Sequence, residues 1–497
     1  MNGLAGSHPP AAVPENRWKR AALLVALFTV VYGAKLWIVD YAGSPVPFWD
    51  QWGAEGMGLF KPFLLGQLSW QTIVTPLNEH RIILTKLLAL GLFRGNGMWD
   101  PRLEMVVNAT IAAGTATLVA HLILLEIGDA CLRPVVSMVA LLWVLPYGWE
   151  NSVMGIQSLL YFLVLFSFAA LWGLSYGPPF TTRWWIGFAS VALACLTMAS
   201  GMLAGLAIAA IRGLAIVLDR RTWRTHWLTM ILALAFAAVT WLSSRHIPTH
   251  DGLNAQGPGY FLEFLSKCLS WPALKIPFAF LLLQAPLFVA VRRLAQENGR
   301  SPARWFVLAL AIWGGMQSVV LAYARGYRGG FPPSRYQDIF VIGFLAAFVA
   351  WLLEWPRINR WIRWCWILLA TIGLVQSASH DIRRSLPEVR QSRIEQARRC
   401  RVYVETEDPA ILRKVSDPLD IPLGDAEKLA ACLDDPQLRS ILLFVPGQEG
   451  RAGWPTQISN GLLKSSRAIF GLGLLGLLTM LWLQPAGGPG PDPRLGT

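Results

Sequence analysis

The chain has 497 residues, of which 54% are hydrophobic and only 15% are charged. Soluble proteins carry roughly 25% charged residues, so this composition excludes a soluble domain and predicts a multi-pass protein embedded in a lipid bilayer. The net charge of +13 does not indicate a nucleic-acid partner, because arginines in membrane proteins serve to retain loops in the cytoplasm.

The hydropathy pattern predicts an all-α membrane protein of about twelve transmembrane helices. The first apolar segment follows Arg17, Lys19 and Arg20 and is long enough to span the bilayer, so we interpret it as an anchor. We place a tight turn at Ser200 and Gly201, because residues 184–218 are too long for one span. The expected spans are residues 21–39, 104–125, 134–147, 152–176, 184–198, 202–218, 227–242, 273–291, 305–324, 337–353, 361–376 and 468–483.

Charge assigns the loops to the two sides of the membrane. With the N-terminus inside, the basic runs within residues 212–224, 292–304 and 357–363 fall in the cytoplasm, as the positive-inside rule requires. An additional span at residues 82–93 would reverse this assignment. We therefore expect that segment to be an interfacial or re-entrant helix within a large external loop of residues 40–103, which also holds an amphipathic piece at residues 55–68.

The first external loop opens with YAGSPVPFWDQWGAEG, which places Asp50 between Trp49 and Trp52. A carboxylate at the membrane surface with aromatic walls suits a general base, and an ordinary interfacial acid is the alternative. Asp40 and Glu55 are further candidates for the same role.

The same loop later contains PLNEHRI, with Asn78, Glu79, His80 and Arg81 adjacent. These four residues combine an amide, an acid, an imidazole and a guanidinium. Arg81 suits a phosphate, and His80 and Glu79 suit proton transfer. The alternative interpretation is a cap of the following apolar helix.

Two further loops are expected on this face. The first, YGWENSVMGIQ, carries Trp149, Glu150, Asn151 and Gln157. This set suits a sugar, because an indole stacks on the ring while amides and carboxylates bind hydroxyls, although a simple polar turn would also account for it.

The second loop, ARGYRGGFPPSRYQD, departs from the positive-inside rule, since it is external and yet carries Arg325, Arg328 and Arg335. Anion binding explains such a departure, because guanidinium binds phosphate through two parallel hydrogen bonds. Tyr327, Tyr336 and Asp338 are placed to orient these arginines. The alternative is an exception to the rule without function.

The polar residues 379–460 are expected to form a small external α/β domain between the membrane module of residues 1–378 and a final span with a cytoplasmic tail in residues 461–497. Within it, RVYVE reads as a strand and DAEKLAACLDD as a helix capped by Asp425. Cys400 and Cys432 lie in this region, and the sequence leaves open whether they pair.

No metal-binding spacing of His or acidic residues occurs, and no nucleotide-binding or nucleophile-elbow motif occurs either. The sequence therefore predicts no cofactor, and a divalent metal is unsupported.

Taken together, these features resemble the GT-C superfamily of integral-membrane glycosyltransferases. Its members have an acid in a long first external loop, about a dozen spans, and external Arg or His residues that face a lipid phosphate. The bacterial mannosyl-, aminoarabinosyl- and O-antigen-modifying transferases are the most similar in style. Asp50 matches the family's acid by position, and the three external arginines match its phosphate-binding residues by location.

The resemblance implies transfer of a sugar from a polyprenyl-phosphate-linked donor to a glycan or lipid acceptor, outside the bacterial inner membrane. The second acid that some branches place beside the first is absent here, because Trp49 and Gln51 flank Asp50. This absence argues against a metal-dependent mechanism. The alternatives are a flippase or exporter of lipid-linked saccharides, and a polysaccharide polymerase or ligase.

Overall fold

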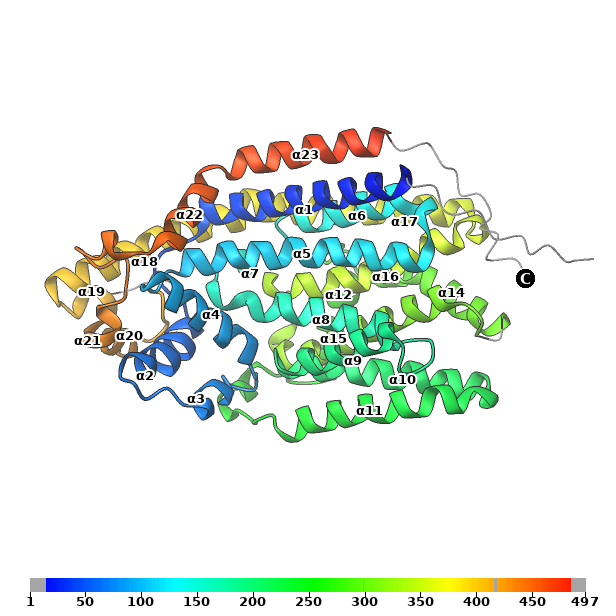
Figure 1. The fold of residues 1–497 in the computed structure, drawn as a ribbon, viewed down its shortest axis with the longest axis horizontal. Coiled ribbons are helices and arrows are strands. Elements are labelled where there is room, and N and C mark those ends of the chain that lie inside the picture. Colours follow the sequence, from blue (N-terminus) through cyan, green and yellow to red (C-terminus); the bar gives the residue numbers. More distant parts are fainter. Residues whose placement is uncertain (1–14, 298, 415–417, 484–497) are drawn as a thin grey trace, which may run out of the picture.

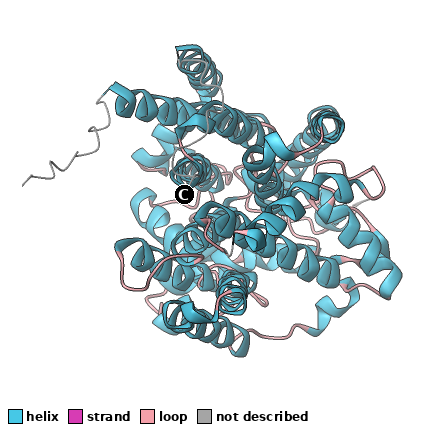
Figure 2. Cartoon of the chain, turned by 90° about the vertical axis from the view of Figure 1, so that its right-hand side faces the viewer, coloured by secondary structure: helices cyan, strands magenta, loops and turns pink. Residues whose placement is uncertain are grey.

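The computed structural model describes residues 15–297, 299–414 and 418–483 of the chain. These residues form an all-helical bundle whose long helices run side by side (Figure 1). Within these ranges no strand occurs beyond two isolated bridges, Leu77 to His80 and Trp99 to Leu442, and Figure 2 shows the same helical character end-on.

Ten helical segments of the described chain are long and apolar enough to cross a membrane, so this is a multi-pass membrane protein. They contain α1 (Glu15–Ala42), α5 (Pro101–Ile127), α8 (Ser158–Leu174), α10 (Met202–Leu218), α11 (Trp223–Leu242), α13 (Ala279–Leu283) with α14 (Ala285–Gln296), α15 (Pro302–Arg325), α16 (Gln337–Glu354), α17 (Arg360–His380) and α23 (Ser466–Leu483).

Ten of the about twelve predicted spans contain a helix of this length. The predicted spans at residues 134–147 and 184–198 are helices, α6 (Leu132–Val144) and α9 (Thr182–Cys195), but they have only 13 and 14 residues. At about 1.5 Å per residue they reach about 20 Å, against about 30 Å of hydrocarbon. Pro146 follows α6 closely, and the predicted turn at Ser200 and Gly201 is a short 3-10 turn before α10.

Close packing of small residues joins the first and last long helices. A Cβ on Gly33 of α1 would overlap the backbone at Phe470 of α23, and a Cβ on Gly473 would overlap the backbone at Val30. Small residues let transmembrane helices approach in this way.

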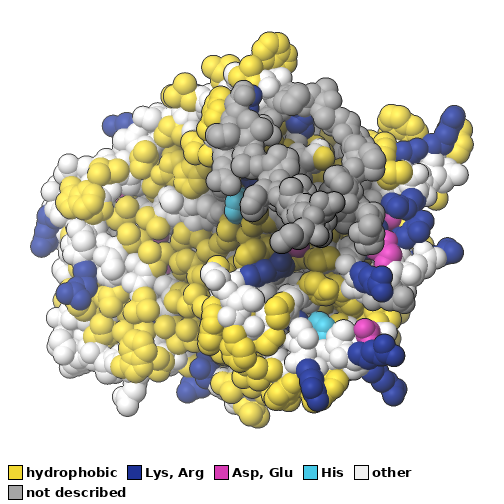
Figure 3. Space-filling model, turned by 45° about the vertical axis from the view of Figure 1, so that its right-hand side comes forward, with side chains coloured by type: hydrophobic (Ala, Val, Ile, Leu, Met, Phe, Trp, Pro, Cys, Tyr) yellow, Lys and Arg dark blue, Asp and Glu magenta, His cyan; other side chains and the backbone are white. Residues whose placement is uncertain are grey.

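Much of the bundle's side is hydrophobic, and many lysines and arginines lie towards the right-hand edge in Figure 3.

One end of the bundle carries a helical cap. It combines α2 (Lys61–Leu64), α3 (Trp70–Val74) and α4 (Ile83–Asn96) of the first loop with α18 (Leu386–Thr406), α19 (Ala410–Arg413), α20 (Ala426–Asp434) and α21 (Pro436–Arg439), as Figure 1 shows at its left end. Trp52, Phe60, Trp99, Leu433 and Leu438 are buried together in its core. The first loop and the late polar region therefore share one hydrophobic core.

The predicted α/β unit is corrected, because this region is helical. RVYVE lies inside α18, where Tyr403 and Val404 are buried by α-helical rather than alternating spacing. The predicted cap is confirmed, since the Asp425 side chain accepts a hydrogen bond from the backbone N–H of Lys428 at the start of α20. Cys400 and Cys432 are buried free thiols.

Helix α17 continues through a short π-helical segment, η10 (Asp381–Ser385), directly into α18. The resulting helix runs from Arg360 to Thr406 over 47 residues. This continuous helix extends from the membrane bundle into the cap, where the side chains of α18 pack. Between α21 and α23, the helix α22 (Trp454–Lys464) returns the chain to the bundle. The predicted cytoplasmic tail after residue 483 and the first 14 residues lie outside the described residues.

Candidate functional site

A cavity of about 400 Å³ lies between the helical cap and the ends of the long helices. Eleven of the residues singled out in the sequence line it, and they come from four separate segments of the chain. They are Trp49, Asp50, Asn78, Glu79, His80, Trp149, Glu150, Gln157, Arg325, Arg335 and Tyr336.

Asp50 enters this cavity at the start of a helical turn that leads into a π-helix, η1 (Trp52–Phe60). The preceding residue, Trp49, has a φ of 48°, and its backbone N–H donates to the carbonyl of Pro422 in the cap at 2.7 Å. The next residue, Gln51, is fully buried, and its amide donates to Glu55 at 2.8 Å and to Glu104 at 2.9 Å. Both neighbours of Asp50 are thus anchored while its own side chain is open to the cavity.

The electrostatic surroundings of Asp50 suit a base. Burial raises the pKa of the Asp50 carboxyl, and Glu79 adds to this, while Arg335 and His250 act in the opposite sense. Among the described residues, no cation lies within ion-pair distance of Asp50 (4.0 Å). The carboxylate is therefore available to accept a proton.

Glu79 is the centre of a charged cluster. Its carboxylate lies 3.0 Å from His250 Nδ1, 3.4 Å from an Arg325 Nη2 and 3.7 Å from His80 Nε2. Burial alone would raise the pKa of Glu79, but His80, His250 and Arg325 outweigh it and hold the pKa below its usual range. Glu79 is thus ionised and paired, which makes it an organiser of cations rather than a base.

Burial, with Arg325 and His250, lowers the pKa of His80, and Glu79 only partly opposes this. His80 is therefore neutral near pH 7. Its Nδ1 accepts from the backbone N–H of Ala199 at 3.4 Å, which leaves the ring proton on Nε2, facing Glu79. That tautomer is inferred from the hydrogen-bond partners.

Arg335 is held by the loop that contains Glu150. The Glu150 carboxylate accepts from the backbone N–H of Arg335 at 2.9 Å and lies 3.6 Å from its guanidinium. The Asn151 amide donates to the carbonyl of Arg335 at 2.8 Å and to Asp338 at 2.7 Å. The guanidinium also lies 5.1 Å from the ring centre of Tyr336, so two loops far apart in sequence fix its position.

Besides Asp40, Glu55 and Asp338, five predicted residues do not line the cavity. Trp52 is fully buried against Trp99 in the cap. Asn151 does not line the cavity, but it holds the backbone of Arg335, which does. Arg81 donates to the carbonyl of Ser243 at 3.3 Å, next to the end of α11. Arg328 and Tyr327 are exposed and stack on each other, 5.0 Å from guanidinium to ring centre.

Sequence reasoning missed several residues of the cavity wall. His250 comes from a loop after α11, and Ser392, Arg393 and Gln396 come from α18. In the sequence this stretch of α18 resembles a solvated charged helix, and the i, i+3 spacing of Arg393 and Gln396 was its sole indication of a shared face.

The arrangement can hold an anion at Arg325 and Arg335, stack a ring on Trp49 or Trp149, and accept a proton at Asp50. Among the described residues, no three His, Cys, Asp or Glu side chains are arranged to hold a metal ion. Comparison with known proteins found no protein-family model, no curated protein and no solved structure that matches this chain.

Proposed function

We propose that this protein is a membrane glycosyltransferase that moves a sugar from a polyprenyl-phosphate-linked donor to a glycan or lipid acceptor on the extracytoplasmic face of a bacterial inner membrane. The observation that carries the proposal is the cavity itself, in which a carboxyl without an ion-pair partner, Asp50, shares walls with Arg325 and Arg335. A base and a leaving-group clamp are the two groups that a single displacement needs.

In this mechanism the acceptor hydroxyl loses its proton to Asp50 as its oxygen bonds to the anomeric carbon of the donor sugar. The bond from that carbon to the phosphate oxygen breaks, and its electron pair leaves with the lipid phosphate. Arg325 and Arg335 stabilise the negative charge that develops there. Trp49, Trp149 and Tyr336 supply aromatic faces for the sugar, and Asn78, Glu150 and Gln157 supply hydrogen-bonding groups for its hydroxyls.

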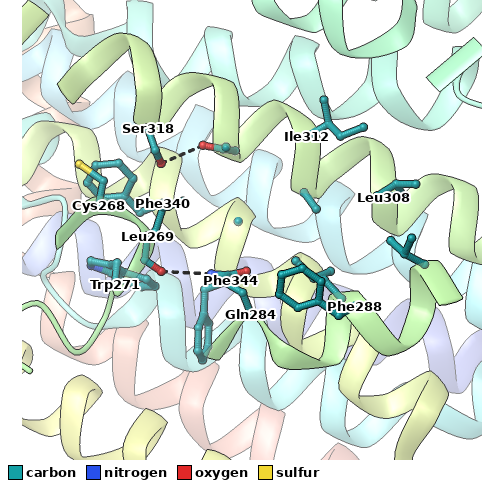
Figure 4. Close-up of a pocket in the computed structure, with 16 residues that line it drawn as sticks. Cys268, Leu269, Trp271, Gln284, Phe288, Leu308, Ile312, Ser318, Phe340 and Phe344 are labelled. Atoms are coloured by element: carbon teal, nitrogen blue, oxygen red, sulfur yellow. Dashed lines mark hydrogen bonds between the residues drawn. The ribbon is translucent and has the colours of Figure 1, made fainter. Parts of the chain in front are cut away.

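A second cavity supports the lipid character of the donor. It has about 290 Å³, and its walls come from α14, α15, α16 and the end of α12 (Pro258–Leu269). Figure 4 shows Trp271, Phe288, Phe340 and Phe344 among its lining. Ser318 in this apolar cavity and Arg325 in the charged one lie seven residues apart on α15, about 10 Å along the helix. A lipid phosphate at Arg325 could place part of its hydrocarbon chain here.

A flippase or exporter remains the second candidate, because the bundle also buries a charged pair. Lys35 of α1 is 1% exposed and Asp338 of α16 is 4% exposed, and they interact electrostatically. Ionisable residues inside a membrane bundle are often part of a transport path. A polymerase or ligase is the third candidate, and it would not need Asp50.

Replacing Asp50 separates these candidates. In a strain lacking the gene, plasmid-borne wild type should restore a sugar on an envelope glycan or lipid, seen by mass spectrometry, whereas Asp50→Asn should not. The amide keeps the shape but cannot take the proton, and losing a general base costs about a hundredfold or more.

Asp40→Asn is the matched control, because Asp40 is an exposed acid at the end of α1. It should restore the modification fully. Full restoration by Asp50→Asn, with protein present in the membrane, would rule out Asp50 as the base and favour the transport or polymerase alternatives.

A further inference from the structure

Arg393 is the cation of the cavity that lacks a carboxylate partner. It lies on α18 in the cap, is only 6% exposed and lines the cavity. Arg325 and Arg335 each have a carboxylate within 4 Å, Glu79 and Glu150 respectively. Among the described residues, no carboxylate lies within ion-pair distance of Arg393.

The contacts that Arg393 does make are weak for a buried guanidinium. It donates to Gln396 Oε1 at 3.3 Å and to the carbonyl of Val153 at 3.5 Å, and it lies 3.4 Å from the ring centre of Phe48. A buried charge is costly unless it is paired and hydrogen-bonded. The ring offsets part of this cost, but an anion would offset more.

The neighbours of Arg393 hold it in place for such an anion. The Gln396 amide nitrogen donates to the carbonyl of Leu419, which directs its oxygen towards Arg393. Ser392 also faces the cavity and offers a hydroxyl. The guanidinium is thus oriented before any ligand binds, which reduces the entropy lost on binding.

Arg393 and Arg325 also lie among different charged groups of the cavity. Arg325 belongs to the Glu79 cluster at the end of α15, whereas the carboxylate that acts on Arg393 from a distance is Glu150. Arg325 extends from a membrane-spanning helix, and Arg393 lies on the cap. A lipid phosphate approaching along α15 would reach Arg325 first.

We infer that Arg393, with Gln396 and Ser392, forms a second oxyanion site, which binds a phosphate group on the side of the cavity that the cap covers. The inference deepens the proposed function and rests on it for one point, that the phosphate belongs to a substrate. The phosphate is carried either by the acceptor or by the lipid donor, and the two sources can be distinguished.

The experiment measures binding without turnover. Purified protein in detergent is titrated with inorganic phosphate and, separately, with undecaprenyl phosphate, and binding is followed by thermophoresis. The variants are Arg393→Gln, Arg325→Gln and Arg390→Gln. Arg390 is the matched control, because it lies one turn earlier on α18, is exposed and packs against Tyr41 outside the cavity.

Arg393→Gln should weaken binding of inorganic phosphate by about tenfold or more, as expected for the loss of a charge-assisted hydrogen bond, and should leave undecaprenyl phosphate binding unchanged. Arg325→Gln should do the reverse, and Arg390→Gln should change neither. If Arg393→Gln weakens undecaprenyl phosphate binding instead, the site stands and serves the donor. If it weakens neither, the inference is overturned.

Arg393→Lys guards against a folding defect, since it retains the charge and the stem while losing the planar fork. It should bind phosphate with an intermediate affinity and melt as wild type does. The binding assay requires no turnover, so it tests the phosphate site separately from the proposed function. If Arg393→Gln weakens phosphate binding while Asp50→Asn retains activity, the phosphate site stands and only the glycosyltransferase proposal is overturned.

Discussion

At the scale of single residues, the three arginines of residues 325–335 are not equivalent. Arg325 and Arg335 line the cavity with Asp50, whereas Arg328 lies outside it with a φ of 53° and stacks on Tyr327. The expectation that all three bind phosphate therefore narrows to two.

Arg325→Ala and Arg335→Ala should each weaken donor use by about 1.5–3 kcal/mol, the range for a hydrogen bond to a charged group. Arg328→Ala should leave donor use unchanged and serves as the control from the same loop. The measurement is kcat/KM for the donor, or envelope modification at limiting expression. A loss as large in Arg328→Ala would show that the loop's overall charge, rather than the cavity, binds the donor.

The raised pKa of Asp50 also predicts a pH profile. Burial raises this pKa, and Arg335 opposes the rise, so kcat/KM should increase with pH as the carboxyl ionises and then level off. Removing the nearby cation in Arg335→Gln should move this ascending limb to higher pH, because the carboxylate loses a stabilising charge. Arg328→Gln should not move it. An ascending limb that moves to lower pH in Arg335→Gln would contradict the assignment of Asp50 as the base.

At the scale of elements, the candidate base lies on the turn that leads into the π-helix η1. Its geometry places Gln51 between two buried acids, Glu55 of η1 and Glu104 of α5. Gly155 is needed beside them, because a Cβ there would overlap the Glu104 carboxylate and the Gln51 amide. Four buried groups from three elements therefore position the turn that starts with Asp50.

This buried cluster predicts a dependence of stability on pH. Burial raises the pKa of Glu55 to about 7 from its usual value of 4.5, against hydrogen bonds that lower it. The folded state therefore binds a proton more tightly than the unfolded state, and stability should fall as the pH rises from about 4.5 through about 7.

Glu55→Gln removes this titration while its amide oxygen still accepts the bond from Gln51, so its melting temperature in detergent should depend less on pH across that range. Glu405→Gln, an exposed substitution on α18, should keep the wild-type slope. Equal slopes in wild type and Glu55→Gln would show that Glu55 does not carry the linkage.

At the scale of the whole molecule, the cavity loops gather at one end of the bundle with the cap (Figure 1). The basic residues that follow α10, α14 and α16 lie in the turns that lead into α11, α15 and α17, and not in the cavity loops. The positive-inside rule predicts that those turns lie in the cytoplasm and that the cap lies outside.

Single-cysteine labelling tests this sidedness in a variant lacking the six native cysteines. A membrane-impermeant maleimide should label intact cells at position 327 or 454, where Tyr327 and Trp454 are exposed. It should label positions 221 and 300 only after the membrane is opened. Labelling of position 221 in intact cells would invert the predicted topology and place the candidate site on the cytoplasmic face.

The sequence by itself determined the membrane environment, the helical class of the bundle and the loops in which chemistry-bearing residues gather. Long apolar segments and the distribution of arginines predict these properties from local sequence, because each span must satisfy its own backbone hydrogen bonds within the bilayer. Helices α6 and α9 lie at the predicted spans of residues 134–147 and 184–198, and with 13 and 14 residues they are shorter than the ten long helices.

Only the tertiary structure decided which loop residues meet. Trp49 and Trp52 are three residues apart, and one faces the cavity while the other is buried against Trp99. The turn between them is held by the hydrogen bond from Gln51 to Glu104 and leads into the π-helix η1. The strand expected at RVYVE is helical because α18 continues from α17 and packs on the first loop. Arg393 reaches the cavity through that same packing, which links residues more than 300 positions apart.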